Sequence, residues 1–133
     1  MKRVLTGSVV ALALVALAAD GPGTARFPSP IELAVSKEGA RLFALCEGTD
    51  EVVVFDARSA KIVRRIKVGR VPKGLALSPD GTRLYVANSW SDSISRVSDD
   101  VSVVDLAAGM EVKRLAAGRG ASYLALSPDG ASI

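Results

Sequence analysis

Few residues of this chain have the type and spacing needed for acid–base or metal chemistry. The 133 residues include no histidine and one cysteine, Cys46. The sequence therefore offers no imidazole base, no histidine-ligated metal site and no Cys-x-x-Cys-His haem attachment. Because Cys46 has no partner for an internal disulfide, we expect a small buried apolar residue rather than a reactive thiol. Neither a catalytic residue nor a cofactor is predicted within these residues.

Two acidic segments have some likeness to binding motifs. Asp92, Asp99 and Asp100 lie close together, but their spacing matches no standard cation-binding loop, so we expect solvated loop carboxylates. The segment SPDG at residues 78–81 could suggest a nucleophile or a calcium loop. Its residue types are those of a tight turn and it recurs along the chain, so we interpret it as structural. No metal site is predicted.

Four residues are candidates for ligand binding: Arg70, Lys73, Trp90 and Arg119. The basic residues fall in predicted links between structural units, and Trp90, the only tryptophan, falls in a predicted loop. If the links converge at one end of the molecule, their charges would attract a small anionic ligand or an acidic protein partner. The alternatives are solvated charges for each basic residue and packing against a neighbouring sheet for Trp90.

The elements that would position these residues belong to an internal repeat. Residues 29–45 align with residues 71–87, and a third copy begins at Ala121 and runs to Ile133. The middle copy carries four strand signals, at residues 74–78, 83–88, a third ending near 101–106, and 111–116, and SPDG supplies the turn chemistry of a hairpin. Segments such as LYVA at residues 84–87 are apolar on both sides of the pleat, which indicates a sheet covered on both faces.

One segment, LAAGMEVKRLAA at residues 106–117, has a composition that also suits a helix. Its counterpart in the first copy is richer in β-branched residues. Gly109 aligns with the position at which a turn is predicted in the first copy. We therefore predict a turn followed by a strand.

Four antiparallel strands per unit of about 40 residues predict an all-β chain built of β-propeller blades. The blades are expected at residues 27–69 and 70–118, with a third begun at 119–133. The sequence of the repeat also resembles the YVTN-type β-propeller repeats of secreted and periplasmic bacterial proteins. The matching residues are Pro72 and residues 74–81, 84–88 and 103–105. The first copy departs from the pattern at Lys37-Glu38, where a looser turn is expected, and at Cys46.

The resemblance implies that the first strand of each blade lines a central channel whose mouth is surrounded by the blade links. Such propellers act as binding scaffolds, as lactonase-like enzymes and as partners of cytochrome-type domains. Because closed propellers have about four to eight blades, we expect this chain to be a propeller fragment whose open blade faces favour association.

The second unit is seven residues too long. Gly39 and Gly81 are 42 positions apart, whereas Gly81 and Gly130 are 49 apart, and the excess coincides with a stutter, SWSDSIS followed by RVSDDVS. One explanation is a local duplication that lengthens a loop. The other, which we favour, is that Ser95 and Arg96 come from different blades and that an intervening segment is absent. Either way, the extra residues are expected to form an exposed loop or a lengthened hairpin.

The N-terminus has a secretory signal pattern at residues 1–25, with Lys2 and Arg3 before an apolar run. Cleavage is expected after Ala18 or Ala25, and an uncleaved anchor is the alternative. The mature chain then has 15 basic and 13 acidic residues, which is no excess for nucleic-acid binding, and no membrane span remains. The expected location is periplasmic or secreted.

Two functions are compatible with the sequence. The first is an extracytoplasmic propeller that acts as a non-catalytic binding or protein-interaction scaffold, and we lean towards it. The alternative is the N-terminal part of a propeller enzyme, a lactonase-like hydrolase or a cytochrome-linked redox protein, with catalytic residues beyond Ile133.

Overall fold

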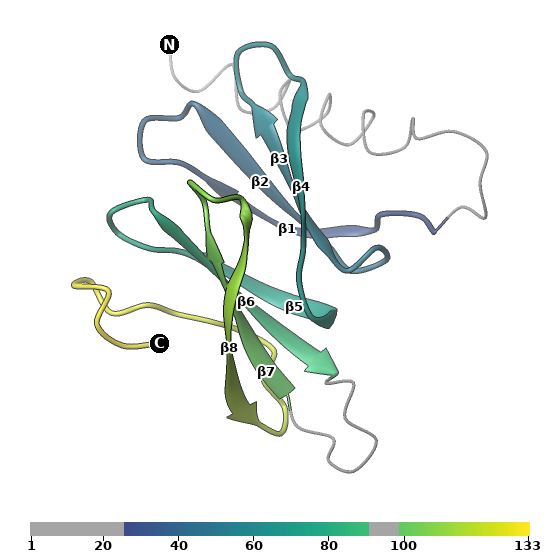
Figure 1. Ribbon diagram of the computed structural model, residues 1–133, viewed down its shortest axis with the longest axis vertical. Coiled ribbons are helices and arrows are strands. Elements are labelled where there is room, and N and C mark those ends of the chain that lie inside the picture. The colour runs from purple at the N-terminus through teal and green to yellow at the C-terminus, as the bar shows by residue number, and fades with distance from the viewer. Residues whose placement is uncertain (1–25, 91–98) are drawn as a thin grey trace.

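The computed structural model describes residues 26–90 and 99–133, which form two four-stranded antiparallel sheets (Figure 1). The first sheet has the order β1-β2-β3-β4 and the second β5-β6-β7-β8. The strands are β1 (Pro30–Val35), β2 (Arg41–Cys46), β3 (Glu51–Asp56), β4 (Ile62–Lys67), β5 (Arg70–Leu77), β6 (Arg83–Trp90), β7 (Asp99–Asp105) and β8 (Met110–Gly118). The prediction of an all-β chain with four-stranded antiparallel blades is confirmed.

The ambiguous segment at residues 106–117 forms a turn followed by β8, as predicted. Within residues 26–90 and 99–133, no helix is long and apolar enough to cross a membrane. The predicted signal segment, residues 1–25, lies outside the described residues.

The same turn closes the first hairpin of each repeat. The serine at its first position donates its N–H to a carbonyl five residues later, at Arg41 in the first copy (2.9 Å), Arg83 in the second (2.9 Å) and Ser132 in the third (3.0 Å). The glycine of each turn has a φ near +70°, a conformation that glycine adopts without a steric penalty. The expectation of a looser first turn is wrong, because the flanking serine and glycine set the geometry whatever the two residues between them.

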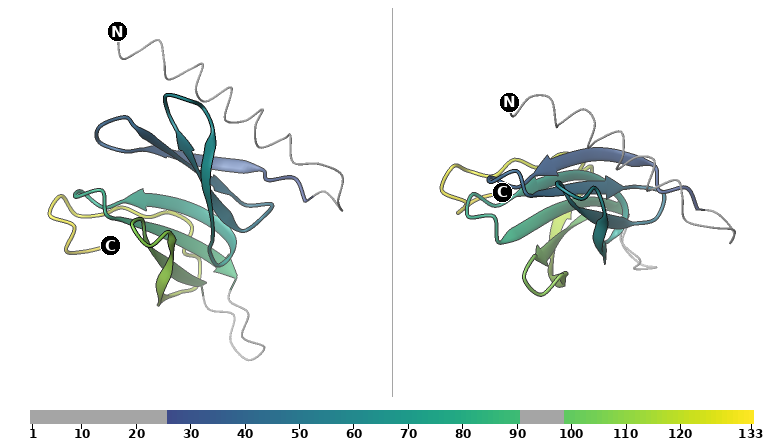
Figure 2. Two further views of the ribbon diagram at one scale, coloured as in Figure 1. Left: turned by 45° about the horizontal axis from the view of Figure 1, so that its top comes forward. Right: turned by 90° about the horizontal axis from the view of Figure 1, so that it is seen from above.

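The two sheets pack face to face, with β1 in contact with β5 and β4 in contact with β8 (Figure 2). The shared core consists of buried aliphatic and aromatic side chains: Phe43, Leu45, Val52, Val54, Ile66, Val68, Leu75, Leu84, Val86 and Val104. Each such valine or leucine contributes about 1.5–3 kcal/mol when it leaves water. Burial on both faces explains why the central strands lack a period-two pattern.

The third repeat lies on the opposite face of the second sheet, as the yellow trace of Figure 1 shows. Leu124 and Leu126 pack there against Tyr85, Val101 and Val103. The approach requires Gly74, because a Cβ at this position would come within 2.9 Å of the Ser122 carbonyl oxygen. The third repeat therefore stacks on the second sheet as the second sheet stacks on the first.

The second half of the stutter supplies the third strand of the second sheet, because β7 begins at Asp99. The residues predicted to form an exposed loop, 91–98, lie outside the described residues. Both explanations of the stutter remain open.

Candidate binding surfaces at the two ends of the blades

The links that carry the candidate basic residues are fixed by a repeated carboxylate contact, here called the link clasp. Asp50 accepts the N–H of Val71 at 2.9 Å, and Asp99 accepts the N–H groups of Ala121, at 2.8 Å, and Gly120. Asp50 and Asp99 occupy equivalent positions just before and at the start of the third strand of their sheets. Each clasp therefore joins one repeat to the first strand of the next.

The clasped residues have an unusual backbone. Val71 has a φ of 50° and Gly120 a φ of 84°, and Ser29, at the equivalent position of the first repeat, has a φ of 46°. A positive φ is costly for a β-branched residue such as valine. It persists at Val71 because the Asp50 carboxylate fixes the N–H that this conformation presents.

Arg70 and Arg119 directly precede the clasped residues, so they hold equivalent positions in successive links. Both are exposed. The Cα of Arg70 pairs with that of Trp90 in the β5–β6 register, so these two candidates share one end of the sheet. Arg119 lies in the turn that follows β8.

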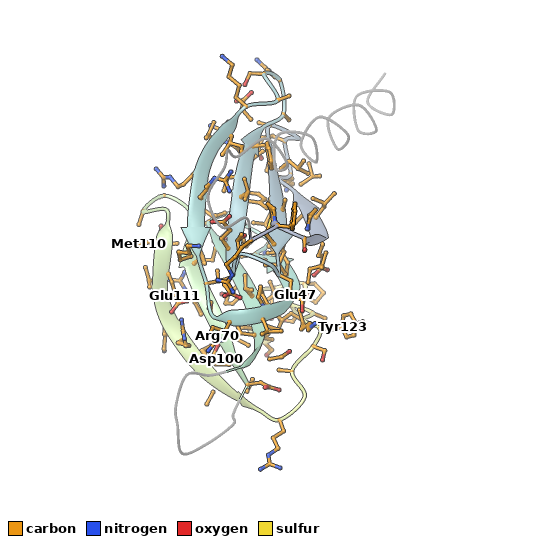
Figure 3. All side chains as sticks on the ribbon, turned by 90° about the vertical axis from the view of Figure 1, so that its right-hand side faces the viewer. Glu47, Arg70, Asp100, Met110, Glu111 and Tyr123 are labelled. Carbon is orange, nitrogen blue, oxygen red and sulfur yellow. The ribbon has the colours of Figure 1, made fainter. Side chains whose placement is uncertain are left out.

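Lys73 has a specific partner that the sequence did not indicate. Its Nζ lies 2.5 Å from Oε1 of Glu47, which follows β2 in the first sheet. Figure 3 shows Glu47, Arg70 and Asp100 in the same region of the molecule. The Glu47 carboxylate offsets the charge of Lys73, so this lysine adds less to the positive potential at this end than an isolated cation would.

Asp99 and Asp100 are not solvated loop carboxylates. Their exposed fractions are 5% and 6%, because β7 begins at Asp99 and the link folds over it. Asp100 accepts a hydrogen bond from Asn88 at 2.7 Å and lies 3.6 Å from the guanidinium of Arg114. Asp92 lies outside the described residues.

A buried polar network ties the link to the interior of the second sheet. Ser102 Oγ accepts the N–H of Gly69 at 3.1 Å and the amide of Asn88 at 2.9 Å, and donates to Glu111 at 2.7 Å. The Oδ1 atom of Asn88 is buried and has no hydrogen-bond partner within the described part of the chain. The network links the backbone between the sheets to three strands of the second one.

The first sheet has apolar residues where the second has this network. Cys46 is the counterpart of Asn88 and Val53 that of Ser102, and both are fully buried in a cluster with Phe55. Burial raises the pKa of the Cys46 thiol to about 11, with a further contribution from the Glu51 carboxylate. The expectation of a buried cysteine is confirmed, and the raised pKa favours an unreactive thiol.

The described residues hold no group of three or more histidine, cysteine, aspartate or glutamate side chains that could bind a metal ion. The carboxylates of the turns are engaged locally. Hydrogen bonds from Ser78 and Thr82 hold the pKa of Asp80 at about 2, and those from Ser59 do the same for Asp56. The structural interpretation of SPDG is consistent with this geometry.

Comparisons with known proteins place the chain among propellers. No curated protein matches it. Among solved structures, hydrazine synthase of Kuenenia stuttgartiensis matches with 32% identity and a TM-score of 0.71, over 84% of this chain and 30% of that one. A putative 6-phosphogluconolactonase of Bacteroides fragilis matches with 22% identity and a TM-score of 0.63, over 77% and 30%.

A functionally unknown protein of Desulfotomaculum acetoxidans has the same fold at 10% identity, with a TM-score of 0.64 over 74% of this chain and 30% of that chain. The chain thus spans about 30% of the length of these three structures. The model of the family described as lactonase, 7-bladed beta-propeller, matches residues 9–108. Since this match covers most of the sequence, the chain belongs to the lactonase family of seven-bladed β-propellers.

Proposed function

We propose that the chain is part of an extracytoplasmic propeller of YVTN-type repeats that acts as a binding or protein-interaction scaffold. The observation that carries this proposal is the use of the carboxylates at the link end. Asp50 and Asp99 hold backbone N–H groups, and Glu51 pairs with Arg65 at 2.8 Å and with Lys67 at 3.5 Å. Acids committed to such contacts stabilise a rigid surface rather than transfer protons.

The exported location is supported by the sequence of residues 1–25, with two basic residues before an apolar run. The expected mature N-terminus lies between Ala19 and Arg26. N-terminal sequencing of exported protein tests this, and an intact Met1 would contradict it.

The proposed binding surface is the link end, with Arg70, Lys73, Trp90 and Arg119. Its ligand would be a small anion or an acidic segment of a partner protein, attracted by the basic residues of the links. Binding should therefore weaken with added salt, as contacts between exposed charges do.

The test is the binding of a polyglutamate peptide to the full-length protein between 50 and 300 mM salt, values chosen to vary the Debye length from about 14 to about 6 Å. Replacing Arg70, Lys73 and Arg119 with alanine should weaken binding by about tenfold and reduce its salt dependence. The control removes three basic residues from the opposite end, Lys37, Arg58 and Lys61. Equal losses in the two triple variants would show non-specific attraction and refute the assignment.

The alternative is the N-terminal part of a propeller enzyme, a lactonase-like hydrolase or a cytochrome-linked redox protein. The family match is compatible with the hydrolase version. Its catalytic residues would lie beyond Ile133. Hydrolysis of a δ-lactone by the full-length protein at a rate well above that of buffer would favour this alternative over the scaffold.

A further inference from the structure

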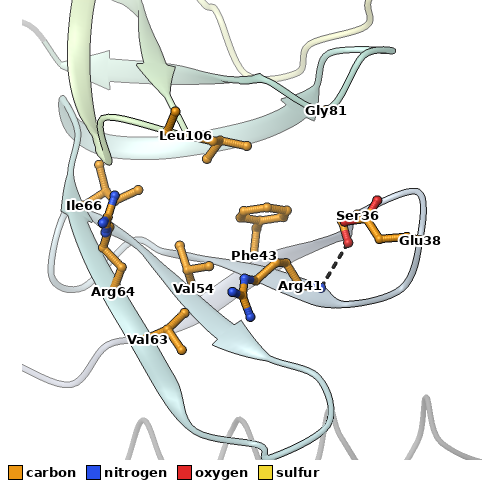
Figure 4. Close-up of a pocket in the computed structure, with 11 residues that line it drawn as sticks. Ser36, Glu38, Arg41, Phe43, Val54, Val63, Arg64, Ile66, Gly81 and Leu106 are labelled. Carbon is orange, nitrogen blue, oxygen red and sulfur yellow. Dashed lines mark hydrogen bonds between the residues drawn. The ribbon is translucent and has the colours of Figure 1, made fainter.

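A groove of about 280 Å³ lies between the two sheets at the end opposite the links (Figure 4). Its walls come from both sheets and include five apolar side chains: Phe43, Val54, Val63, Ile66 and Leu106. Figure 4 shows Phe43 and Val54 of the first sheet on one side of the groove and Leu106 of the second on the other. The other lining residues are Ser36, Glu38, Arg41, Arg64, Gly81 and Ala107. The groove therefore places apolar side chains beside charged ones, so that a ligand could contact both.

Arg64 is the cation best placed to meet a ligand in this groove. Within residues 26–90 and 99–133, its guanidinium forms no ion pair, whereas Arg41 is held by Asp56 at 2.6 Å. The arginine lies against the β7–β8 turn at Gly109, where a Cβ would overlap the guanidinium. The neighbouring sheet thus positions the side chain at the edge of the groove.

The first-sheet side of the groove carries an excess of positive charge. The turns and strands that flank it in the first sheet carry five basic residues and two acidic ones: Lys37, Arg41, Arg58, Lys61, Arg64, Glu38 and Asp56. Both acids have lowered pKa values, because each accepts local hydrogen bonds. The acids are ionised at neutral pH, and the excess of positive charge persists there.

The same hollow recurs between the second sheet and the third repeat, but its chemistry differs. That hollow is lined by the counterparts of the first set: Ser78, Asp80, Arg83, Tyr85 and Gly130. Pro79, Thr82 and Asp129 complete its lining, and it has no cation from an outer strand. The stacking of repeats explains the space, and the first groove adds Arg64 and the apolar side chains named above to it.

We propose that the groove between the two sheets binds a small carboxylate with an apolar body. The carboxylate would pair with the guanidinium of Arg64, whose planar fork suits bidentate contact. The apolar body would lie on Phe43, Val54 and Leu106. The volume lies just below the usual range for ligand sites, about 300–1,000 Å³, so the ligand is expected to be small. This site is independent of the link end proposed above.

The test uses hexanoate as the probe and measures its binding to the full-length protein by titration of NMR chemical shifts. Hexanoate is expected to bind with a dissociation constant of about 1 mM, as suits so few buried atoms. Hexanol lacks the charge and acetate lacks the apolar body, so each should bind at least about tenfold more weakly.

Two variants locate the binding. Arg64→Gln removes the cation and should weaken the binding of hexanoate by about tenfold. Ala107→Trp should abolish hexanoate binding because the indole fills the groove. Lys113→Gln is the matched control, since Lys113 holds the position of Arg64 in the second sheet. Equal binding of hexanol and hexanoate, or unchanged binding in Arg64→Gln, overturns the proposal. If Arg64→Gln does not fold, unchanged hexanoate binding in Ala107→Trp overturns it.

Discussion

Replacing Gly69 with alanine is expected to destabilise the chain by about 2–3 kcal/mol. Gly69 lies in the link between the sheets, and a Cβ there would lie 2.9 Å from the Cβ of Asn88 and closer still to its amide. Asn88 is fully buried, so it has no free space into which to move. The substitution must displace the asparagine or the link.

The magnitude follows from the bonds that Asn88 makes. Its amide donates to the Asp100 carboxylate at 2.7 Å and to Ser102 Oγ at 2.9 Å. A hydrogen bond to a charged group contributes about 1.5–3 kcal/mol and a neutral one about 0.5–1.5 kcal/mol. Against this loss, alanine lowers the entropy of the unfolded chain, which restores about 0.4–1 kcal/mol.

Urea unfolding followed by circular dichroism measures the effect, with an unchanged m-value as evidence that both states stay comparable. Gly118→Ala is the control at the equivalent link position, where φ is +80° and no atom lies within 4 Å. It should cost only the backbone strain of about 1–2 kcal/mol. In an Asn88→Ala background, Gly69→Ala should cost at least about 1 kcal/mol less than in the native one. Equal costs in the two backgrounds would refute the proposed clash.

Three further outcomes are expected. Asp99→Ala should destabilise the chain by about 2 kcal/mol and speed amide exchange at Gly120 and Ala121, which the clasp protects; unchanged exchange would count against the clasp. Asp56 and Asp80 have pKa values of about 2 in the folded chain and near 3.9 in the unfolded chain, so their ionised forms stabilise the fold. The Tm should therefore fall as the pH is lowered from 4 to 2, and a constant Tm over this range would contradict the assignment. Cys46, buried with a pKa of about 11, should react with iodoacetamide at pH 8 only after unfolding, and rapid labelling of the native chain would show otherwise.

The strands could be predicted from the sequence because their determinants are local. The SPDG turns and the β-branched runs set hairpins at intervals of about 40 residues, and apolar residues on both sides of a strand indicate stacked sheets. The position of each repeat followed from the glycine of its turn. Local chemistry therefore determined the blades.

The site contacts were harder to predict because they join residues of different repeats. Lys73 pairs with Glu47 across the two sheets, and no pattern within one repeat indicates that contact. Asp99 had the appearance of a loop carboxylate, since its partners are backbone N–H groups that carry no residue-type signal. Its equivalence with Asp50 at the third strand was the only available indication.

Burial explains which half of the stutter forms the third strand. In the other possible register, Asp92 would take the place of Asp50. Arg96 would then stand at the position of Val54, which lies in the core between the sheets. Ser98 would stand at the position of Asp56, which caps a turn. The half that begins at Asp99 instead supplies Val103 and Asp105 at those positions. Burying an unpaired guanidinium costs several kcal/mol, whereas a buried valine contributes about 1.5–3 kcal/mol. The repeated SD dipeptide permits two registers, and the apolar residues that follow it select one.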